Sequence, residues 1–451
     1  MPTYKTPNVY VEEISTFPPS VAEVSTAIPA FIGYTEKAQR GSEDLTNIPT
    51  RINSLLDYET LFGKAETTKF EVTPNGDEIT SINNPDLTYL MYYALRMYFD
   101  NGGGSCYIVS VGQYSNNETK AVVNFQAGLL ALEKEDEPTL ILLTDAVNLS
   151  TTDYYVLCQQ ALEQCNKLKD RFAIFDVLKD VGAIEQFRNN IGSDAGKLKY
   201  GAAYYPYLQT SLNYYYDDDS VTIKGTASTS GTDFSLGSIK ASNTNLYNKI
   251  KAELTKKRVV LPPSAAIAGV YASVDRDRGV WKAPANVSLT SVLAPTVKIS
   301  NEEQENLNVD STAGKSINAI RSFTGKGTLV WGARTLAGND NEWRYISVRR
   351  LFNLIEESIQ KAIAFVVFEP NNAITWLKVK SLMESYLEGL WRQGALAGSS
   401  SEQAYFINIG LGKSMTAQDI LEGRMIVEVG LAVSRPAEFI ILRFSHKLQE
   451  A

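Results

Sequence analysis

The sequence contains a single histidine, His446, in 451 residues. A Ser-His-Asp triad, a histidine general base or a histidine-based metal site would have to be built around that one ring. We interpret His446 as a polar residue without a catalytic role. The sequence therefore predicts no catalytic residue, no metal site and no cofactor.

Cysteine is also scarce. The chain has three cysteines, and Cys158 and Cys165 stand seven residues apart on a helical pattern that places Ala161 and Leu162 on the same face. This spacing is typical of buried side chains. We expect these two thiols and Cys106 to be buried, reduced and free of metal.

Long apolar runs and long runs of one charge are absent too. No stretch approaches the ~18 apolar residues that span a bilayer, and residues 1–15 lack the pattern of a signal peptide. We expect a protein that is made in the cytosol and does not insert into membranes. Acidic residues outnumber basic ones, 51 against 43, without a run of five like charges. This composition argues against nucleic acid as a partner.

Two glycine-containing segments resemble phosphate loops only in part. Asn101-Gly-Gly-Gly-Ser105 follows a predicted helix and precedes a predicted strand, which is the reverse of the order that a phosphate loop needs. Gly314-Lys-Ser316 has Val309 where a Walker A loop has its first glycine. Neither segment predicts a nucleotide site.

Asp275-Arg-Asp-Arg278 is the remaining candidate for chemistry, because it places carboxylates beside guanidiniums. Alternating charges near a helix end more often form ion pairs within or between subunits. A soluble α/β hydrolase-like enzyme that uses such carboxylates is nevertheless the rival to a structural protein. The enzyme would run as a small oligomer.

Residues 1–26 predict an extended arm. Their one strand-like run, Val9-Tyr-Val-Glu-Glu-Ile14, lies between prolines. A lone strand cannot satisfy its own backbone, so we expect it to pair with a sheet edge in its own subunit or in another.

Residues 27–340 predict an α/β domain with a mostly parallel sheet, because strands alternate with helices. A sequence with few apolar anchors, within residues 211–245, predicts a surface insertion or a small hairpin. The expected strands cover residues 28–34, 107–111, 140–144, 172–177 and 200–205, and the expected helices cover 152–168, 184–190, 247–257 and 265–274, with a further helix from Asn84-Pro-Asp86 to Asn101.

Residues 341–451 predict an α+β domain. Helices and antiparallel strands are grouped here instead of alternating. The expected helices cover residues 348–366, 372–392 and 416–421, and the expected strands cover 404–409, 425–433 and 438–444.

Several segments resemble contractile tail sheath proteins, and the resemblance spans nearly the whole chain. It is weakest at residues 64–83 and 211–245, and it is closer to the sheaths of extracellular contractile injection systems, such as antifeeding-prophage-like particles, than to those of long-tailed phages. The segments are Tyr4-Lys-Thr-Pro-Asn-Val-Tyr-Val-Glu-Glu-Ile14, Ala27-Ile-Pro-Ala-Phe-Ile-Gly-Tyr34, Asp100-Asn-Gly-Gly-Gly104, Gly279-Val-Trp-Lys-Ala-Pro-Ala-Asn286, Val330-Trp-Gly-Ala-Arg-Thr-Leu336, Trp343-Arg-Tyr-Ile-Ser-Val-Arg-Arg350 and Arg435-Pro-Ala-Glu-Phe-Ile-Ile-Leu-Arg-Phe-Ser-His446.

The resemblance implies a subtilisin-like middle domain and terminal arms that are exchanged between neighbouring subunits. Because residues 1–445 contain no histidine, a protease triad is not expected in that domain. The residues implied in strand exchange are Val9, Tyr10, Val11, Glu12, Glu13 and Ile14 in the first arm, and Phe439, Ile440, Ile441, Leu442, Arg443 and Phe444 in the second.

The resemblance also implies that a short helix of the last domain holds an inner tube. The residues that it places against the tube are Thr416, Gln418, Asp419, Glu422 and Arg424. The alternative is that this helix is only a capped connector.

The implied function is that of a sheath subunit, which polymerises as a helical mesh around an inner tube and contracts to drive the tube through an envelope. The implied partners are further copies of the chain, the tube protein, and baseplate and cap proteins, with sheath paralogues as an open alternative. We expect assembly in the cytoplasm and a place in an extracellular or phage-tail-like particle. A phage tail is the alternative to an injection system.

Overall fold

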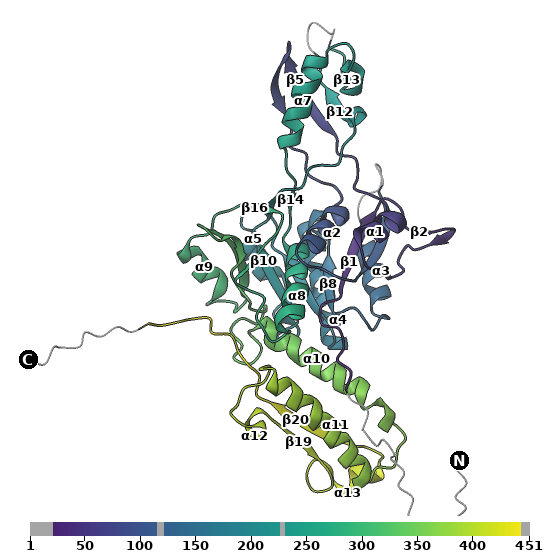
Figure 1. The fold of residues 1–451 in the computed structure, drawn as a ribbon, viewed down its shortest axis with the longest axis vertical. Helices are drawn as coiled ribbons and strands as arrows, with labels where there is room; N and C mark the ends of the chain where they lie inside the picture. Colours follow the sequence, from purple (N-terminus) through teal and green to yellow (C-terminus); the bar gives the residue numbers. More distant parts are fainter. Residues whose placement is uncertain (1–20, 115–120, 226–230, 443–451) are drawn as a thin grey trace, which may run out of the picture. The chain divides into compact units, whose positions relative to one another are not determined.

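The computed structural model of the chain describes residues 21–114, 121–225 and 231–442 (Figure 1). They form two compact units. The α/β unit holds Ser25–Leu354 and residues 435–442, and the C-terminal unit holds residues 21–24 and Ile355–Ser434. The chain passes from one unit to the other inside helix α10 (Ile346–Ala362). The domain limits that we expect from the sequence, 27–340 and 341–451, stay predictions.

A nine-stranded sheet forms the centre of the α/β unit. Its middle strands, from β7 to β17, all pair in parallel, and antiparallel strands flank them at both edges. This arrangement confirms the predicted mostly parallel sheet. Across the sheet the order is β15 (Val287–Ser288), β18 (Gly327–Val330), β17 (Ile317–Phe323), β10 (Gly201–Tyr205), β9 (Phe172–Asp176), β8 (Leu140–Leu143), β1 (Pro29–Thr35), β7 (Cys106–Gln113) and β4 (Thr50–Ile52).

Helices cover both faces of this sheet. Successive side chains of a strand point to opposite faces, so Ile32 of β1 joins one apolar core and its neighbour Phe31 joins the other. The three cysteines are buried and unpaired in these cores, as predicted. The first core includes residues of α3 (Val122–Leu132), α4 (Thr151–Leu168) and α5 (Ala183–Asn190), and the second includes residues of α1 (Leu55–Phe62), α2 (Met91–Asp100) and α8 (Ser264–Arg278).

Helix α2 begins later than predicted. The sequence favours a start at Asn84-Pro-Asp86, but the first helical residue is Met91. The carboxylate of Asp145 accepts a hydrogen bond from the Leu90 N–H at 2.5 Å. It therefore caps the helix from 55 residues away, at the end of β8. A local sequence pattern contains no sign of such a cap.

Two segments that are far apart in the sequence form a small module with a core of its own (Figure 1). The hairpin predicted within residues 211–245 is present as β12 and β13. Residues 70–82, which carry no predicted element, complete its sheet, and β5 pairs in parallel with β12. The module consists of β13 (Phe234–Ser235), β12 (Val221–Ile223), β5 (Phe70–Asn75), β6 (Glu78–Ile82) and α7 (Thr244–Lys256).

Shorter elements connect these parts of the α/β unit. They include a three-stranded sheet in the order β14-β11-β16 and a hairpin of β2 and β3. Their bounds are β2 (Gln39–Arg40), β3 (Glu43–Asp44), β11 (Leu208–Thr210), β14 (Val260–Leu261), β16 (Val292–Pro295), α6 (Ala195–Leu198), α9 (Asn301–Asn308), η1 (Ala146–Asn148), η2 (Asp218–Ser220) and η4 (Gly237–Ile239).

The C-terminal unit is built around a long helix and a two-stranded antiparallel sheet, as the α+β prediction requires. Helix α11 begins where predicted, because the side chain of Asn372 accepts hydrogen bonds from two N–H groups of its first turn. Residues 438–442 do not form the predicted last strand within the described chain. The unit contains η5 (Ala364–Val366), α11 (Ala373–Arg392), α12 (Ser401–Ala404), β19 (Tyr405–Ile409), α13 (Ala417–Leu421) and β20 (Val427–Leu431).

Candidate functional site

The predicted C-terminal exchange segment is exposed. Phe439, Ile440, Ile441 and Leu442 are 70%, 77%, 77% and 72% exposed, although all four are large apolar residues. Contiguous exposed apolar side chains of this kind mark interaction sites. Arg443 and Phe444 lie outside the described residues, as does the whole predicted N-terminal strand, Val9 to Ile14.

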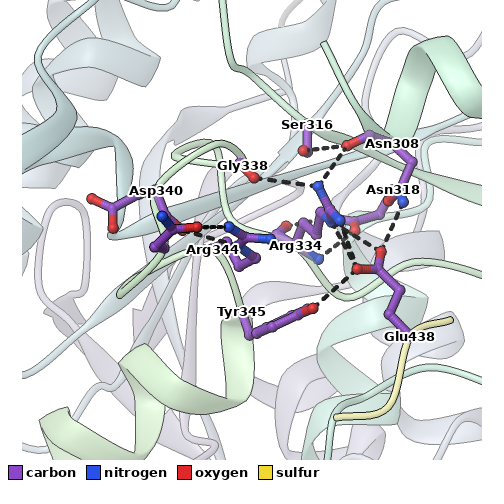
Figure 2. Close-up of polar contacts among 10 residues, drawn as sticks. Asn308, Ser316, Asn318, Arg334, Gly338, Asp340, Arg344, Tyr345 and Glu438 are labelled. Carbon is purple, nitrogen blue, oxygen red and sulfur yellow. Dashed lines mark hydrogen bonds and ion pairs between the residues drawn. The ribbon is translucent and has the colours of Figure 1, made fainter. Parts of the chain in front are cut away.

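An ion pair between the buried Arg334 and the partly buried Glu438 holds the residue just before this segment (Figure 2). The guanidinium of Arg334 donates from Nη2 to Glu438 at 2.6 Å and from Nε to both carboxylate oxygens, at 2.9 and 3.2 Å. The amide of Asn308 donates to the same carboxylate at 2.7 Å, and the Tyr345 hydroxyl donates to it at 3.1 Å. Donors from three parts of the α/β unit thus converge on Glu438.

This environment keeps Glu438 ionised. Partial burial alone would raise the pKa of the carboxyl group, but the hydrogen bonds from Arg334, Asn308 and Tyr345 outweigh it, and the pKa of Glu438 falls below its ordinary value. The Arg334 side chain is only 4% exposed. Its charge is therefore compensated mainly by Glu438.

A second buried arginine holds the root of the N-terminal segment. Arg350 donates to the Thr26 carbonyl at 2.8 Å and to the carboxylate of Asp275 at 2.5 and 3.0 Å. The side chains of this pair are 3% and 5% exposed. Arg276 also pairs with Asp277, so the interpretation of residues 275–278 as ion-pairing residues is confirmed for three of the four. Sequence reasoning missed Arg350, because it lies 75 residues from Asp275 in the sequence.

The two-stranded sheet of the C-terminal unit carries no third strand in the described residues, and beyond the end of β20 a single antiparallel bridge joins Leu396 to Val433. In the part of the chain that the structure describes, β19 and β20 pair with each other, in register from Tyr405↔Leu431 to Ile409↔Val427. No third strand pairs with either of them there. A two-stranded sheet is rarely stable by itself. Each strand therefore offers a row of backbone groups to an added strand.

The five residues expected against an inner tube form one polar network around α13, and all of them except Asp419 are exposed. Thr416 and Asp419 cap the helix reciprocally, and Arg424 pairs with Asp419 at 2.8 Å and with Glu422 at 2.7 Å. The side chain of Gln418 donates to Glu422 at 2.6 Å. The structure therefore brings all five together. It is equally compatible with the alternative of a capped connector.

One buried contact resembles part of a hydrolase site. The Ser264 hydroxyl donates to Asp176 at 2.6 Å and the Ser264 N–H donates to the same carboxylate at 2.8 Å. Both residues are buried, at 5% and 3% exposure, so a substrate does not reach them. The hydroxyl is committed to a carboxylate instead of to a histidine base. We interpret the contact as a cap on the first turn of α8.

Across residues 21–114, 121–225 and 231–442, no three His, Cys, Asp or Glu side chains gather closely enough to hold a metal ion. Within the same ranges, every helix is too short or too polar to cross a membrane.

Comparisons with known proteins identify the family. Residues 199–336 match the phage tail sheath protein central domain, and residues 338–447 match the phage tail sheath C-terminal domain. The sheath complex of PVC, an extracellular contractile injection system, in its contracted state is 33% identical with a TM-score of 0.66, over 100% of this chain and 99% of that one. The chain belongs to the phage tail sheath family. It is therefore a structural sheath subunit and not an enzyme.

Two further relatives agree. The helical sheath of the anti-feeding prophage in its contracted state is 34% identical with a TM-score of 0.66, over 99% of this sheath chain and 100% of that one. The tail sheath protein of Enterobacteria phage T4 is 29% identical over 129 residues, which are 29% of this chain but only 19% of that protein. The predicted similarity to injection-system sheaths is thus confirmed over the full length, whereas the T4 match covers a fraction of a much longer protein.

Proposed function

We propose that this chain polymerises into the helical sheath of an extracellular contractile injection system by exchanging its terminal strands with neighbouring copies. The observation that carries the proposal is the contrast within one chain between four exposed apolar residues, Phe439 to Leu442, and the edges of β19 and β20, which no third strand covers in the described residues. The apolar side chains need a surface that covers them, and the strand edges need a partner for their backbone hydrogen bonds. Strand addition would pair the backbone groups and bury the apolar side chains at once.

Exchange of this kind builds an open assembly. The donated strand and the accepting edge are different segments of the chain, which belong to different units, so the contact is head-to-tail and generates a helix unless the rotation closes a ring. The N-terminal strand Val9 to Ile14 would take a second edge, which gives each subunit several neighbours and produces a mesh. The finer fold prediction, a subtilisin-like middle domain with two exchanged arms, belongs to this proposal, and the nine-stranded sheet with helices on both faces supports it.

Contraction follows if the mesh has two packings with the same strand exchange, an extended one laid down on the tube and a contracted one of lower free energy. The free-energy difference between the two packings is stored at assembly and released when a trigger frees the first ring. The partners are further copies of the chain, the inner tube, and baseplate and cap proteins. Related chains are described in a contracted sheath and in a baseplate, which supports the first and third of these. Assembly takes place in the cytoplasm, and the product is an extracellular particle.

The exposed network around α13 is the proposed grip on the tube. Five polar or charged side chains, at Thr416, Gln418, Asp419, Glu422 and Arg424, suit a contact that must release when the sheath moves. A dry apolar interface would resist that movement.

Electron microscopy tests the exchange. The full chain and a chain without residues 1–15 are each expressed with the tube protein and compared by negative stain. Striated cylinders from the full chain and only small particles from the truncation are expected. Normal cylinders from the truncation would overturn the exchange of the N-terminal strand, and a phage tail attached to the cylinders would favour the alternative origin.

A further inference from the structure

The attachment of the C-terminal segment to the α/β unit ends abruptly, at Glu438. The carboxylate of Glu438 receives hydrogen bonds from three residues, and its side chain is 21% exposed. The next residue, Phe439, is 70% exposed. The chain is therefore bound to the α/β unit at Glu438 and exposed at the very next residue.

We propose that Arg334 and Glu438 form a mooring for the C-terminal arm, which fixes the point and the direction in which the arm leaves the α/β unit at residues 439–442 and so sets its register on a neighbouring copy of this chain. This inference rests on the strand exchange proposed above. It assigns positioning roles to Arg334 and Glu438, neither of which is among the residues implied in strand exchange.

The geometry of the pair suits orientation. Two nitrogens of the Arg334 guanidinium donate hydrogen bonds to the Glu438 carboxylate. Such a two-point contact fixes the direction of the carboxylate as well as its distance. Arg334 is itself fixed, because its backbone N–H donates to Asn318 of β17 at 2.8 Å and its carbonyl accepts from the Asn318 amide at 2.8 Å. The same amide donates to Ala203 of β10 at 3.1 Å. Glu438 is thus connected to the central sheet.

The energetics also favour a positioning role over a purely stabilising one. A buried ion pair loses the hydration of both charges, so it contributes little net stability compared with apolar residues of the same size. Its best-supported use is to select one arrangement among several. In strand pairing this selection is valuable, because a shift of one residue turns every side chain to the opposite face.

A short tether also raises the effective concentration of the arm. Phe439 begins the exposed segment directly after the fixed residue, so little flexible chain separates the mooring from the pairing residues. Shortening the flexible length between two binding points increases their effective concentration. Loss of the mooring would free the chain back to Arg435, whose guanidinium donates to the Asn341 carbonyl at 2.8 Å.

The α/β unit offers a matched control. Arg171 and Asp170 also form a two-point pair, at 2.7 and 2.9 Å, with side chains that are 1% and 13% exposed. That pair lies in the same unit but holds no terminal segment. A general effect of losing a buried ion pair should therefore appear in Asp170→Asn as well as in Glu438→Gln.

The experiment compares five chains, each expressed in full with the tube protein: parent, Glu438→Gln, Glu438→Asp, Asp170→Asn, and a chain that ends at Glu438. Sheathed particles per amount of soluble subunit are counted by negative stain, and folding is followed by thermal melts. Glu438→Asp keeps the charge but shortens the side chain by one methylene. We expect at least about tenfold fewer sheaths from both Glu438 variants, parent-level assembly from Asp170→Asn, and none from the truncated chain. Sheaths that still form from Glu438→Asp should give weakened layer lines in their Fourier transforms, which reports register instead of stability.

The outcomes separate the two proposals. If the truncated chain fails while both Glu438 variants assemble like the parent, the mooring is wrong and the strand exchange stands. If Asp170→Asn loses as many sheaths as Glu438→Gln, the effect is general destabilisation and the mooring is again wrong. If the truncated chain assembles normally, the C-terminal exchange itself is overturned, and the mooring with it.

Discussion

Asp176 and Ser264 meet at 2.6 Å inside the α/β unit, where the hydroxyl and the N–H of the serine both donate to one carboxylate. The contact joins the end of β9 to the first turn of α8. An aspartate beside a serine would invite a catalytic interpretation in another protein. Here it fastens a helix to the sheet.

Asp176 predicts a pH dependence of folding. Burial raises its pKa from 3.8 to about 7, although the hydrogen bonds from Ser264 oppose the shift. Between these two values the folded chain holds a proton that the unfolded chain has lost. The contribution of Asp176 to the free energy of unfolding therefore decreases as the pH rises through this window, by a few kcal/mol, and is constant above it.

The Asp176→Asn variant removes this titration. Urea denaturation from pH 4.5 to 7.5 should show that the variant gains stability relative to the parent as the pH rises. The Asp170→Asn variant serves as a control for an unrelated carboxylate. Parallel curves for Asp176→Asn and the parent would contradict the prediction.

Loss of Arg350 should be strongly destabilising. Arg350→Met leaves the buried carboxylate of Asp275 without its cation and the Thr26 carbonyl without one of its donors. Breaking one side of a buried pair costs roughly 3–5 kcal/mol. The double variant Arg350→Met with Asp275→Leu should recover much of the loss, as measured by the urea midpoint. Equal midpoints for the single variant and the parent would show that Asp275 finds another partner.

Charge reversal on α13 tests the grip on the tube. Replacing Asp419 and Glu422 together with lysine turns one partly buried acid and one exposed acid into bases and should impair assembly on tubes, while the monomer still folds. Glu402→Lys, an exposed acid of α12, is the matched control. Subunit and tube are mixed and pelleted, and loaded particles are counted. Normal loaded particles from the double variant would support the capped connector instead.

The cysteines should be inert until the chain unfolds. Cys106, Cys158 and Cys165 are fully buried, and burial raises the pKa of each thiol above its ordinary value. A thiol reagent needs an accessible thiolate. We expect no reaction in native buffer within minutes and three equivalents in urea, with Ser193→Cys as an exposed positive control. Rapid native labelling of any of the three would show that its core opens locally.

The elements with local signals were predicted closely. Helix α4 begins at Thr151, after the Ser150 cap, and helix α11 begins after the Asn372 cap, each within one residue of the prediction. The short helix α13 carries its own signal in the reciprocal cap of Thr416 and Asp419. In each case the residues that decide the structure are neighbours in the sequence.

The sequence did not predict elements whose stabilising partners lie far away along the chain. Helix α3 has apolar residues on most sides, which gives it little helical periodicity. Its Gly128 is required by the sheet, because a Cβ there would lie 2.7 Å from a methyl group of Val111. The cap on α2, the pairing of β5 with β12, and the contact of Arg334 with Glu438 across 104 residues likewise have no local signature. Of the candidate site, the family resemblance supplied the exchanged strands and the tube helix, and both stay predictions.

The four-stranded module has a consequence for how such particles can diversify. It folds around its own apolar core, and its strands pair only among themselves in the described chain. Its four strands lie within residues 64–83 and 211–245, and its helix α7 extends beyond them to Lys256. Mutations there leave the proposed exchange strands and the arginines Arg334 and Arg350 unchanged. We therefore expect that sequence changes within the module are tolerated without disturbing the strand pairing of the central nine-stranded sheet.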